Sequence, residues 1–182
     1  MPQATPLRPA VFLDRDGTVI EDRGHLADPS EVMFYPETVN ALRRLQKHFL
    51  LFVVTNQPWV ARGILRLEDV NRVNAHVVSH LAEHGVVITA VYVCPHERSD
   101  GCSCIKPNPY FLHKAAAEYG VDLRRSFTIG DHPHDVDLAR CVGARGVYVR
   151  TGHGSKHLTE LRADEIVVAG IGEATEWILK SS

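Results

Sequence analysis

Six short apolar segments separated by stretches of helical periodicity predict an α/β protein with a doubly wound parallel sheet. The apolar segments lie at residues 10–13, 50–54, 88–93, 127–129, 146–149 and, more weakly, 165–168. Short segments that are apolar throughout are typical of parallel strands covered by helices on both faces. The chain shows no linker or internal repeat, so we expect one Rossmann-like domain over residues 1–182, without a large cap domain.

The predicted helices fill the intervals between these strands. Apolar side chains recur on one helical face at residues 39–45 and again at residues 70–81. Three more helices are predicted at residues 110–119, 134–142 and 173–179. Glycines commonly close helices because they adopt the left-handed conformation at low cost. The glycines expected to do so here are Gly85, Gly120 and Gly143.

The overall composition indicates a globular protein without an electrostatic footprint for nucleic acid. Of the 182 residues 45% are hydrophobic and 23% are charged, and the net charge is -2. The N-terminal residues lack the charged and apolar regions of a signal peptide, and no apolar run is long enough to cross a bilayer. We therefore expect a cytoplasmic monomer with neither a nucleic-acid nor a membrane partner.

Polar side chains with useful chemistry follow four of the predicted strands. In a doubly wound sheet, ligands bind beyond the carboxyl ends of the strands, so these residues are expected to converge. They are Asp14 and Asp16, then Thr55 and Asn56, then Lys106, and finally Asp131 with Asp135 four residues further on.

This set of residues suits magnesium-assisted phosphoryl transfer. Asp14 is the candidate nucleophile, and Asp16 is the candidate proton donor to the leaving oxygen. Asp14 and Asp131, together with the backbone carbonyl of Asp16, offer the hard oxygen ligands that Mg²⁺ prefers. Thr55 and Lys106 can bind phosphate oxygens. Each residue alone also fits an ordinary turn, a surface lysine or a helix N-terminus, but chance convergence of four loops is much less expected.

The residues resemble the four motifs of the haloacid dehalogenase (HAD) superfamily of phosphatases. The matching segments are Asp14-Arg15-Asp16-Gly17-Thr18, Val53-Val54-Thr55-Asn56, Lys106-Pro107, and Gly130-Asp131 with Asp135. The resemblance implies an aspartyl-phosphate on Asp14, general acid and base catalysis by Asp16, and phosphate binding by Thr55 and Lys106. It also implies that Asp14, Asp16 and Asp131 hold Mg²⁺, with Asp135 behind them.

A second group of residues predicts a structural zinc site. Cys94, His96, Cys102 and Cys104 lie within one polar loop at about residues 94–104 and make a complete Cys₃His set. A closed set of four ligands leaves no position for a reactive water, so we expect the metal to stiffen the loop. The alternatives are free thiols or a redox pair, but the Cys-x-Cys spacing is a poor match to redox motifs. Cys141, in an apolar helical stretch, is expected to be buried.

The zinc loop narrows the resemblance to a compact branch of the superfamily. That branch holds heptose 1,7-bisphosphate phosphatases, which remove the 7-phosphate, and histidinol-phosphate phosphatases. Asn56 and the Arg62 loop are more similar to the heptose enzymes, where the arginine is a substrate-binding residue. The implied substrate is therefore a small phosphorylated sugar or polyol, most directly the heptose bisphosphate, with histidinol phosphate as the alternative. The chain departs from this pattern at Pro58-Trp59, Ile105 and His132.

A different class of protein shares part of this pattern. Phosphoaspartate receiver modules also combine a doubly wound sheet with a strand-end aspartate, threonine and lysine. A switch of that kind benefits from a long-lived acyl phosphate, whereas a hydrolase needs a second carboxylate to act as acid and base. Asp16 and the zinc loop therefore favour the enzyme.

Overall fold

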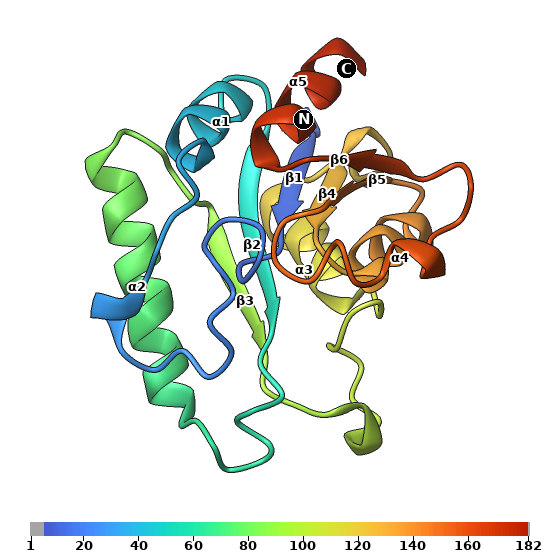
Figure 1. The fold of residues 1–182 in the computed structure, drawn as a ribbon. Helices are drawn as coiled ribbons and strands as arrows, with labels where there is room; N and C mark the ends of the chain where they lie inside the picture. Colours follow the sequence, from blue (N-terminus) through green and yellow to red (C-terminus); the bar gives the residue numbers. More distant parts are fainter. Residues whose placement is uncertain (1–5, 182) are drawn as a thin grey trace, which may run out of the picture.

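The structure is a computed structural model, and it describes residues 6–181. Its six strands form one parallel sheet in the order β3-β2-β1-β4-β5-β6 (Figure 1). The strands are β1 (Ala10–Leu13), β2 (Leu50–Asn56), β3 (Ala90–Cys94), β4 (Phe127–Gly130), β5 (Arg145–Val149) and β6 (Ile166–Val168). The helices are α1 (Thr38–Leu45), α2 (Leu67–Glu83), α3 (Tyr110–Tyr119), α4 (Pro133–Cys141) and α5 (Ile171–Ser181).

This arrangement confirms the predicted fold class and shifts some of the element boundaries. Strand β2 runs two residues beyond the apolar run, to Asn56, so Thr55 lies in the strand. Strand β3 begins at Ala90 rather than at residue 88. It is an edge strand, and Ile88 just before it packs against the core although it lies outside the strand, so its apolar character does not mark a strand residue. Helix α5 begins two residues earlier and ends two residues later than predicted.

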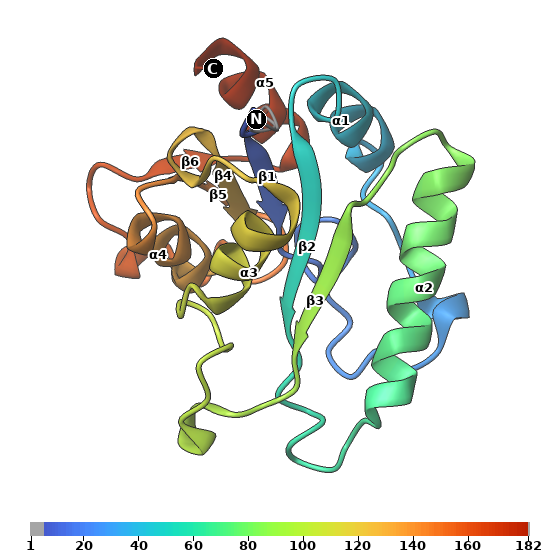
Figure 2. The ribbon, with the colours of Figure 1, turned by 180° about the vertical axis from the view of Figure 1, so that it is seen from behind.

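The strand side chains alternate between two apolar layers, one on each face of the sheet. Val11 and Leu13 of β1 belong to the layer that contains residues of α1, α2 and α5. Ala10 and Phe12 point to the opposite face and pack with Leu112 of α3 and other residues there. Figures 1 and 2 show the two sets of helices on opposite faces. Burial on both faces explains why the strands read as unbroken apolar runs.

The strand order places β1 at the centre of the site-bearing edge. Strand β1 pairs with β2 on one side and with β4 on the other, and all three are parallel. The chain leaving β1 at Asp14 therefore lies between Thr55 and Asn56 at the end of β2 and Asp131 just after β4. Segments far apart in the sequence are thus brought to one end of the sheet, as expected for this fold class.

Residues 6–181 contain no helix that is both long and apolar enough to cross a membrane.

The contact between β5 and α4 leaves no room for a side chain at position 146. A Cβ atom on Gly146 would lie 2.7 Å from the Cα atom and 2.8 Å from the Cβ atom of Val136. Gly146→Ala is expected to push the helix away from the sheet and lower the free energy of unfolding by roughly 1–3 kcal/mol. Urea denaturation followed by circular dichroism checks this, and unchanged stability would contradict the close packing.

Candidate active site

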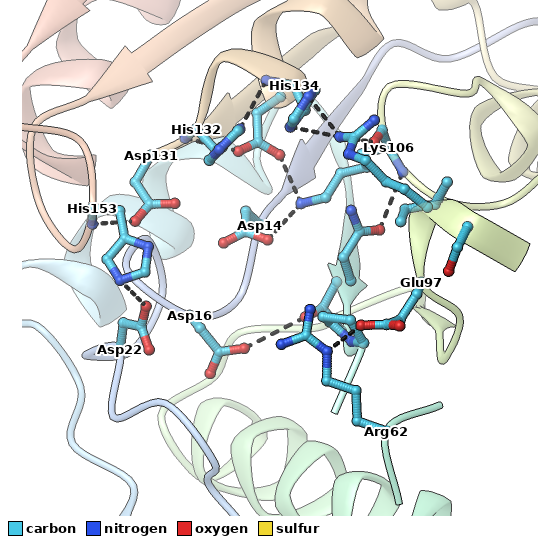
Figure 3. Close-up of a pocket in the computed structure, with 17 residues that line it drawn as sticks. Asp14, Asp16, Asp22, Arg62, Glu97, Lys106, Asp131, His132, His134 and His153 are labelled. Atoms are coloured by element: carbon cyan, nitrogen blue, oxygen red, sulfur yellow. Dashed lines mark hydrogen bonds and ion pairs between the residues drawn. The ribbon is translucent and has the colours of Figure 1, made fainter. Parts of the chain in front are cut away.

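A cleft of about 510 Å³ lies at the carboxyl ends of the central strands (Figure 3). Its walls come from all four of the strand-end segments singled out by the sequence, after β1, β2, β3 and β4, and from His153 after β5. Every predicted catalytic, phosphate-binding and magnesium residue lines it, namely Asp14, Asp16, Thr55, Asn56, Arg62, Lys106, Asp131 and Asp135. The four predicted zinc ligands do not line the cleft; they lie beside it.

The charged centre of the cleft is Lys106 between two carboxylates. Its ammonium nitrogen lies 2.5 Å from Oδ1 of Asp14 and 2.7 Å from Oδ1 of Asp135. The side chains of all three residues are no more than 10% exposed. A buried ion pair of this kind is stable only when each charge has close partners, so the three residues depend on one another.

This environment shifts the pKa values of the central groups. Burial raises the pKa of the Asp14 carboxyl well above its usual range, even though the Lys106 charge opposes the shift. Burial also disfavours the charge of Lys106, but the carboxylates of Asp135 and Asp14 outweigh it and raise the pKa of the lysine. Lys106 is therefore a permanent cation. The neighbouring Asp14 carboxyl binds a proton readily unless a second cation lies beside it.

Asp14, Asp131 and Asp135 form the acidic cluster of the site. Each offers one oxygen, and these oxygens all lie within 4.8 Å of one another. Burial and the nearby charge of Asp135 raise the pKa of Asp131 to about 7. Three crowded carboxylates with one lysine between them carry excess negative charge. A divalent cation with oxygen ligands fits this donor set, because it would offset that charge.

Asp135 has a structural role besides its ion pair. Its Oδ2 atom accepts a hydrogen bond of 3.1 Å from the backbone N–H of His132, which caps the start of α4. Pro133 occupies the first position of that helix, where the missing N–H group is not needed. The helix start thus fixes the carboxylate that holds Lys106.

Two glycines allow Asp131 to be enclosed. A Cβ atom at Gly17 would lie 2.1 Å from Oδ2 of Asp131, and one at Gly152 would lie 2.2 Å from the same atom. The adjacent His153 N–H donates a hydrogen bond of 2.6 Å to Asp131. Gly17 was visible within the first motif, but no local pattern connects residue 152 with residue 17. Their approach follows from the strand order.

Asp16 lies outside the acidic cluster, and it is held there by two residues to which the sequence assigned no role. The buried guanidinium of Arg15 contacts both carboxylate oxygens, with a closest distance of 2.8 Å. The side-chain amide of Gln57 donates a second hydrogen bond of 2.8 Å to Oδ2. Arg15 in turn is anchored by a 2.7 Å hydrogen bond to Oδ1 of Asn74 in α2. The Asp16 carboxylate is thus oriented independently of Asp14, while its predicted backbone ligand role stays a prediction.

Thr55 and Asn56 differ in what they position. The Thr55 hydroxyl accepts a hydrogen bond of 2.9 Å from Gln57 and faces Asp16 at 3.5 Å. The Asn56 side chain accepts a hydrogen bond of 3.2 Å from the backbone N–H of Lys106. Asn56 therefore ties the end of β2 to the loop that carries the lysine.

The rim of the cleft carries Arg62, a stacked pair of histidines and Arg98. Arg62 is ion-paired with Glu97, and its guanidinium lies 4.7 Å from the ring centre of Trp59. The rings of His132 and His134 stack with their centres 4.2 Å apart. Burial lowers the pKa of His134 to about 4, so its ring is neutral at pH 7 and can accept a hydrogen bond.

The four predicted zinc ligands come together in one tight group. Five of the six separations among the three sulfur atoms and the Nδ1 atom of His96 run from 3.2 to 3.8 Å, and the ligand atoms of the group all lie within 4.8 Å of one another. A tetrahedral zinc with sulfur ligands at about 2.3 Å would have edges of about 3.8 Å, so the donor set fits the ion. Burial raises the pKa of the Cys94 thiol, and a bound cation would be needed to hold it as a thiolate.

Cys141 stands outside this group, and the expectation that it is buried was wrong. It is the last residue of α4 and is exposed to solvent. Its apolar neighbour Val142 packs against the core instead, just before the chain enters β5.

Comparisons with known proteins agree with this fold and site. A family model described as HAD-hydrolase-like matches residues 103–174. A Thermoplasma acidophilum protein named probable D-glycero-D-manno-heptose-1,7-bisphosphate 7-phosphatase is 39% identical over 73% of this chain and 84% of its own length. A Yersinia pestis D-glycero-beta-D-manno-heptose-1,7-bisphosphate 7-phosphatase is 34% identical over 95% of this chain and 90% of its own.

A solved structure extends the similarity to three dimensions. The D,D-heptose 1,7-bisphosphate phosphatase from Bordetella bronchiseptica, complexed with magnesium and phosphate, has a TM-score of 0.86 and 31% sequence identity. The alignment covers 96% of this chain and 99% of the other. Fold, site and relatives together define an HAD-like hydrolase, a phosphoric monoester hydrolase. The chain belongs to the family of D-glycero-D-manno-heptose-1,7-bisphosphate 7-phosphatases.

The raised pKa of Asp131 predicts that replacing it with the neutral asparagine changes the stability of the protein by an amount that depends on pH. An ordinary aspartate has a pKa near 3.9, against about 7 for Asp131 in the folded protein. Between these values the folded state keeps a proton that the unfolded chain releases, so the wild type loses stability as pH rises toward 7. In EDTA, Asp131→Asn should raise the melting temperature by several degrees at pH 8, and by less at pH 5. A gain that is the same at both pH values would contradict this assignment.

Proposed function

We propose that the protein is a magnesium-dependent phosphatase that removes the 7-phosphate from D-glycero-D-manno-heptose 1,7-bisphosphate. The observation that carries the proposal is the placement of Lys106 between Asp14 and Asp135, with Asp131 beside them and Asp16 across the cleft. This arrangement joins a nucleophile, a fixed cation, a set of metal ligands and a separate acid. The proposed substrate is the one given in the names of relatives that match nearly the whole chain.

In the first step, an oxygen of Asp14 attacks phosphorus and the bond to the sugar oxygen breaks. Protonated Asp16 gives its proton to that oxygen, and the sugar alcohol leaves. In the second step, the Asp16 carboxylate takes a proton from water, which attacks the same phosphorus and releases phosphate and the Asp14 carboxylate. The bonds of Asp16 to Arg15 and Gln57 orient it for both proton transfers.

The remaining residues bind and neutralise the phosphate. Lys106 offers its positive charge to the phosphate oxygens, and the Thr55 hydroxyl offers a hydrogen bond. Mg²⁺ would be held by Asp14, Asp131 and the backbone carbonyl of Asp16, with Asp135 supporting Lys106. The ion would supply charge stabilisation to the phosphoryl group as it transfers.

We also propose that Cys94, His96, Cys102 and Cys104 hold a structural zinc. The 3.2–3.8 Å separations support this, as does the position of the group directly before Lys106 in the chain. A closed ligand set of this kind stabilises its loop and takes no part in the reaction. Its contribution would be to fix the loop from which the lysine enters the cleft.

The nucleophile assignment is tested by replacing the attacking carboxylate. Asp14→Asn should lower phosphate release from the heptose bisphosphate at least a thousandfold, because the amide cannot form the acyl phosphate. Asp137→Asn is the matched control, since Asp137 lies on α4 with a side chain that is 41% exposed. Circular dichroism should show the same fold in both variants. Retained activity in Asp14→Asn would reject the assignment.

The substrate is tested with a panel. Phosphate release with Mg²⁺ is measured from the heptose 1,7-bisphosphate, histidinol phosphate and several sugar monophosphates. We expect the highest kcat/KM for the heptose bisphosphate. A preference for histidinol phosphate would keep the chemistry and reject the proposed substrate.

The zinc proposal predicts a loss of stability when the ligand set is broken. Cys102→Ser should lower both the zinc content measured by plasma mass spectrometry and the melting temperature, because a bound ligand stabilises only the folded state. Cys141→Ser is the control, since that thiol is exposed and outside the group. Full zinc content in Cys102→Ser, or equal effects of the two changes, would contradict the assignment.

A further inference from the structure

The cleft contains six carboxylates but only three side chains with a permanent positive charge. The carboxylates are Asp14, Asp16, Asp22, Glu97, Asp131 and Asp135, and the cations are Arg62, Arg98 and Lys106. Lys106 is neutralised by Asp14 and Asp135, and Arg62 by Glu97. Within residues 6–181, Arg98 is the cleft cation that has no carboxylate partner.

Arg98 is nevertheless held in place by neutral groups. Its Nη2 atom donates a hydrogen bond of 3.3 Å to the backbone carbonyl of Lys106 and lies 2.6 Å from Nε2 of His134. The His134 ring is itself stacked against His132. These contacts orient the guanidinium without cancelling its charge, which leaves it able to bind an anion from the cleft.

The position of Arg98 relative to the reacting centre sets what it can bind. Lys106 contacts Arg98 through its backbone carbonyl and Asp14 through its ammonium group. The guanidinium can therefore lie no farther from the nucleophile than one extended lysine side chain plus these two contacts, which is within reach of a sugar chain. Ile105, which also lines the cleft, is apolar and offers no charge there.

We propose that Arg98 is a specificity-determining residue that binds the second, non-reacting phosphate of a bisphosphorylated sugar, with His134 orienting it. This inference rests on the proposed function and deepens it. It assigns the preference for a bisphosphate over a monophosphate to a side chain of the loop after β3. The reacting phosphate is bound by other residues, so the two recognition tasks are separable.

The test compares two substrates that differ only in the second phosphate. These are D-glycero-D-manno-heptose 1,7-bisphosphate and the 7-phosphate, which have the same leaving oxygen. Arg98→Gln should lower the ratio of their kcat/KM values about tenfold or more, mainly through KM for the bisphosphate. Arg98→Lys should restore part of the ratio, since a point charge keeps the attraction but loses the planar geometry. Arg72→Gln is the control, an exposed arginine on α2 paired with Asp69, and should leave the ratio unchanged.

Two other results would overturn the proposal. An unchanged ratio in Arg98→Gln would show that the guanidinium does not contact the second phosphate. An equal loss on both substrates would show that Arg98 acts only by positioning Lys106 through its carbonyl. Failure of the wild type to release phosphate from either substrate would instead reject the proposed function.

Binding measurements test the role of Arg98 even if the wild type releases no phosphate from either substrate. Calorimetric titration of both heptose phosphates into Asp14→Asn, with and without Arg98→Gln, measures affinity independently of turnover. The arginine change should weaken binding of the bisphosphate about tenfold or more, and equal affinities with and without it would overturn the proposal.

Discussion

The ion pairs of Lys106 with Asp14 and Asp135 are the constraint on which the rest of the site depends. They join the end of β1, the loop after β3 and the first turn of α4, three segments that are distant in the sequence. Because all three charges are largely buried, removing one would leave the others without compensation. The Asn56 bond to the Lys106 backbone and the capping of α4 by Asp135 serve the same purpose, since each fixes a partner in this triad.

Much of the fold was predictable because burial on both faces of a parallel sheet leaves a simple apolar pattern. The strand-end rule then located the catalytic candidates, and the candidate zinc ligands Cys94, His96, Cys102 and Cys104 could be recognised because they lie close together in the sequence. Most of the missed contacts are ones that only the tertiary arrangement creates, such as those of Arg15 with Asn74 and of Gln57 with Asp16. Arg15 and Gln57 read as ordinary neighbours of motif residues, and Gly152 meets Gly17 only because β5 lies beside β4, two strands from β1. The error at Cys141 arose because apolar composition at a helix end does not say which way the last side chain points.

The carboxylates of the cleft work in two different environments. Asp14, Asp131 and Asp135 are crowded and buried, which raises the pKa values of Asp14 and Asp131 and favours a bound cation. Asp16 is instead surrounded by donors from Arg15 and Gln57. The carboxylates proposed for attack and cation binding would thus be separated from the one proposed for proton transfer, although all four follow only two strands of the sheet. Such separation is what a two-step hydrolysis by paired carboxylates requires.

The close approach of Gly17 and Gly152 around Asp131 has a consequence for how such a protein can diverge. Neither position has room for even a methyl group, so these two positions in the floor of the cleft are closed to substitution. The rim, by contrast, is built from exposed side chains such as those of Arg62 and Arg98. New substrates would be acquired by exchanging rim residues over an unchanged floor. The residues of the floor would then stay the same as such proteins diverge, while the preference for one substrate over another could change.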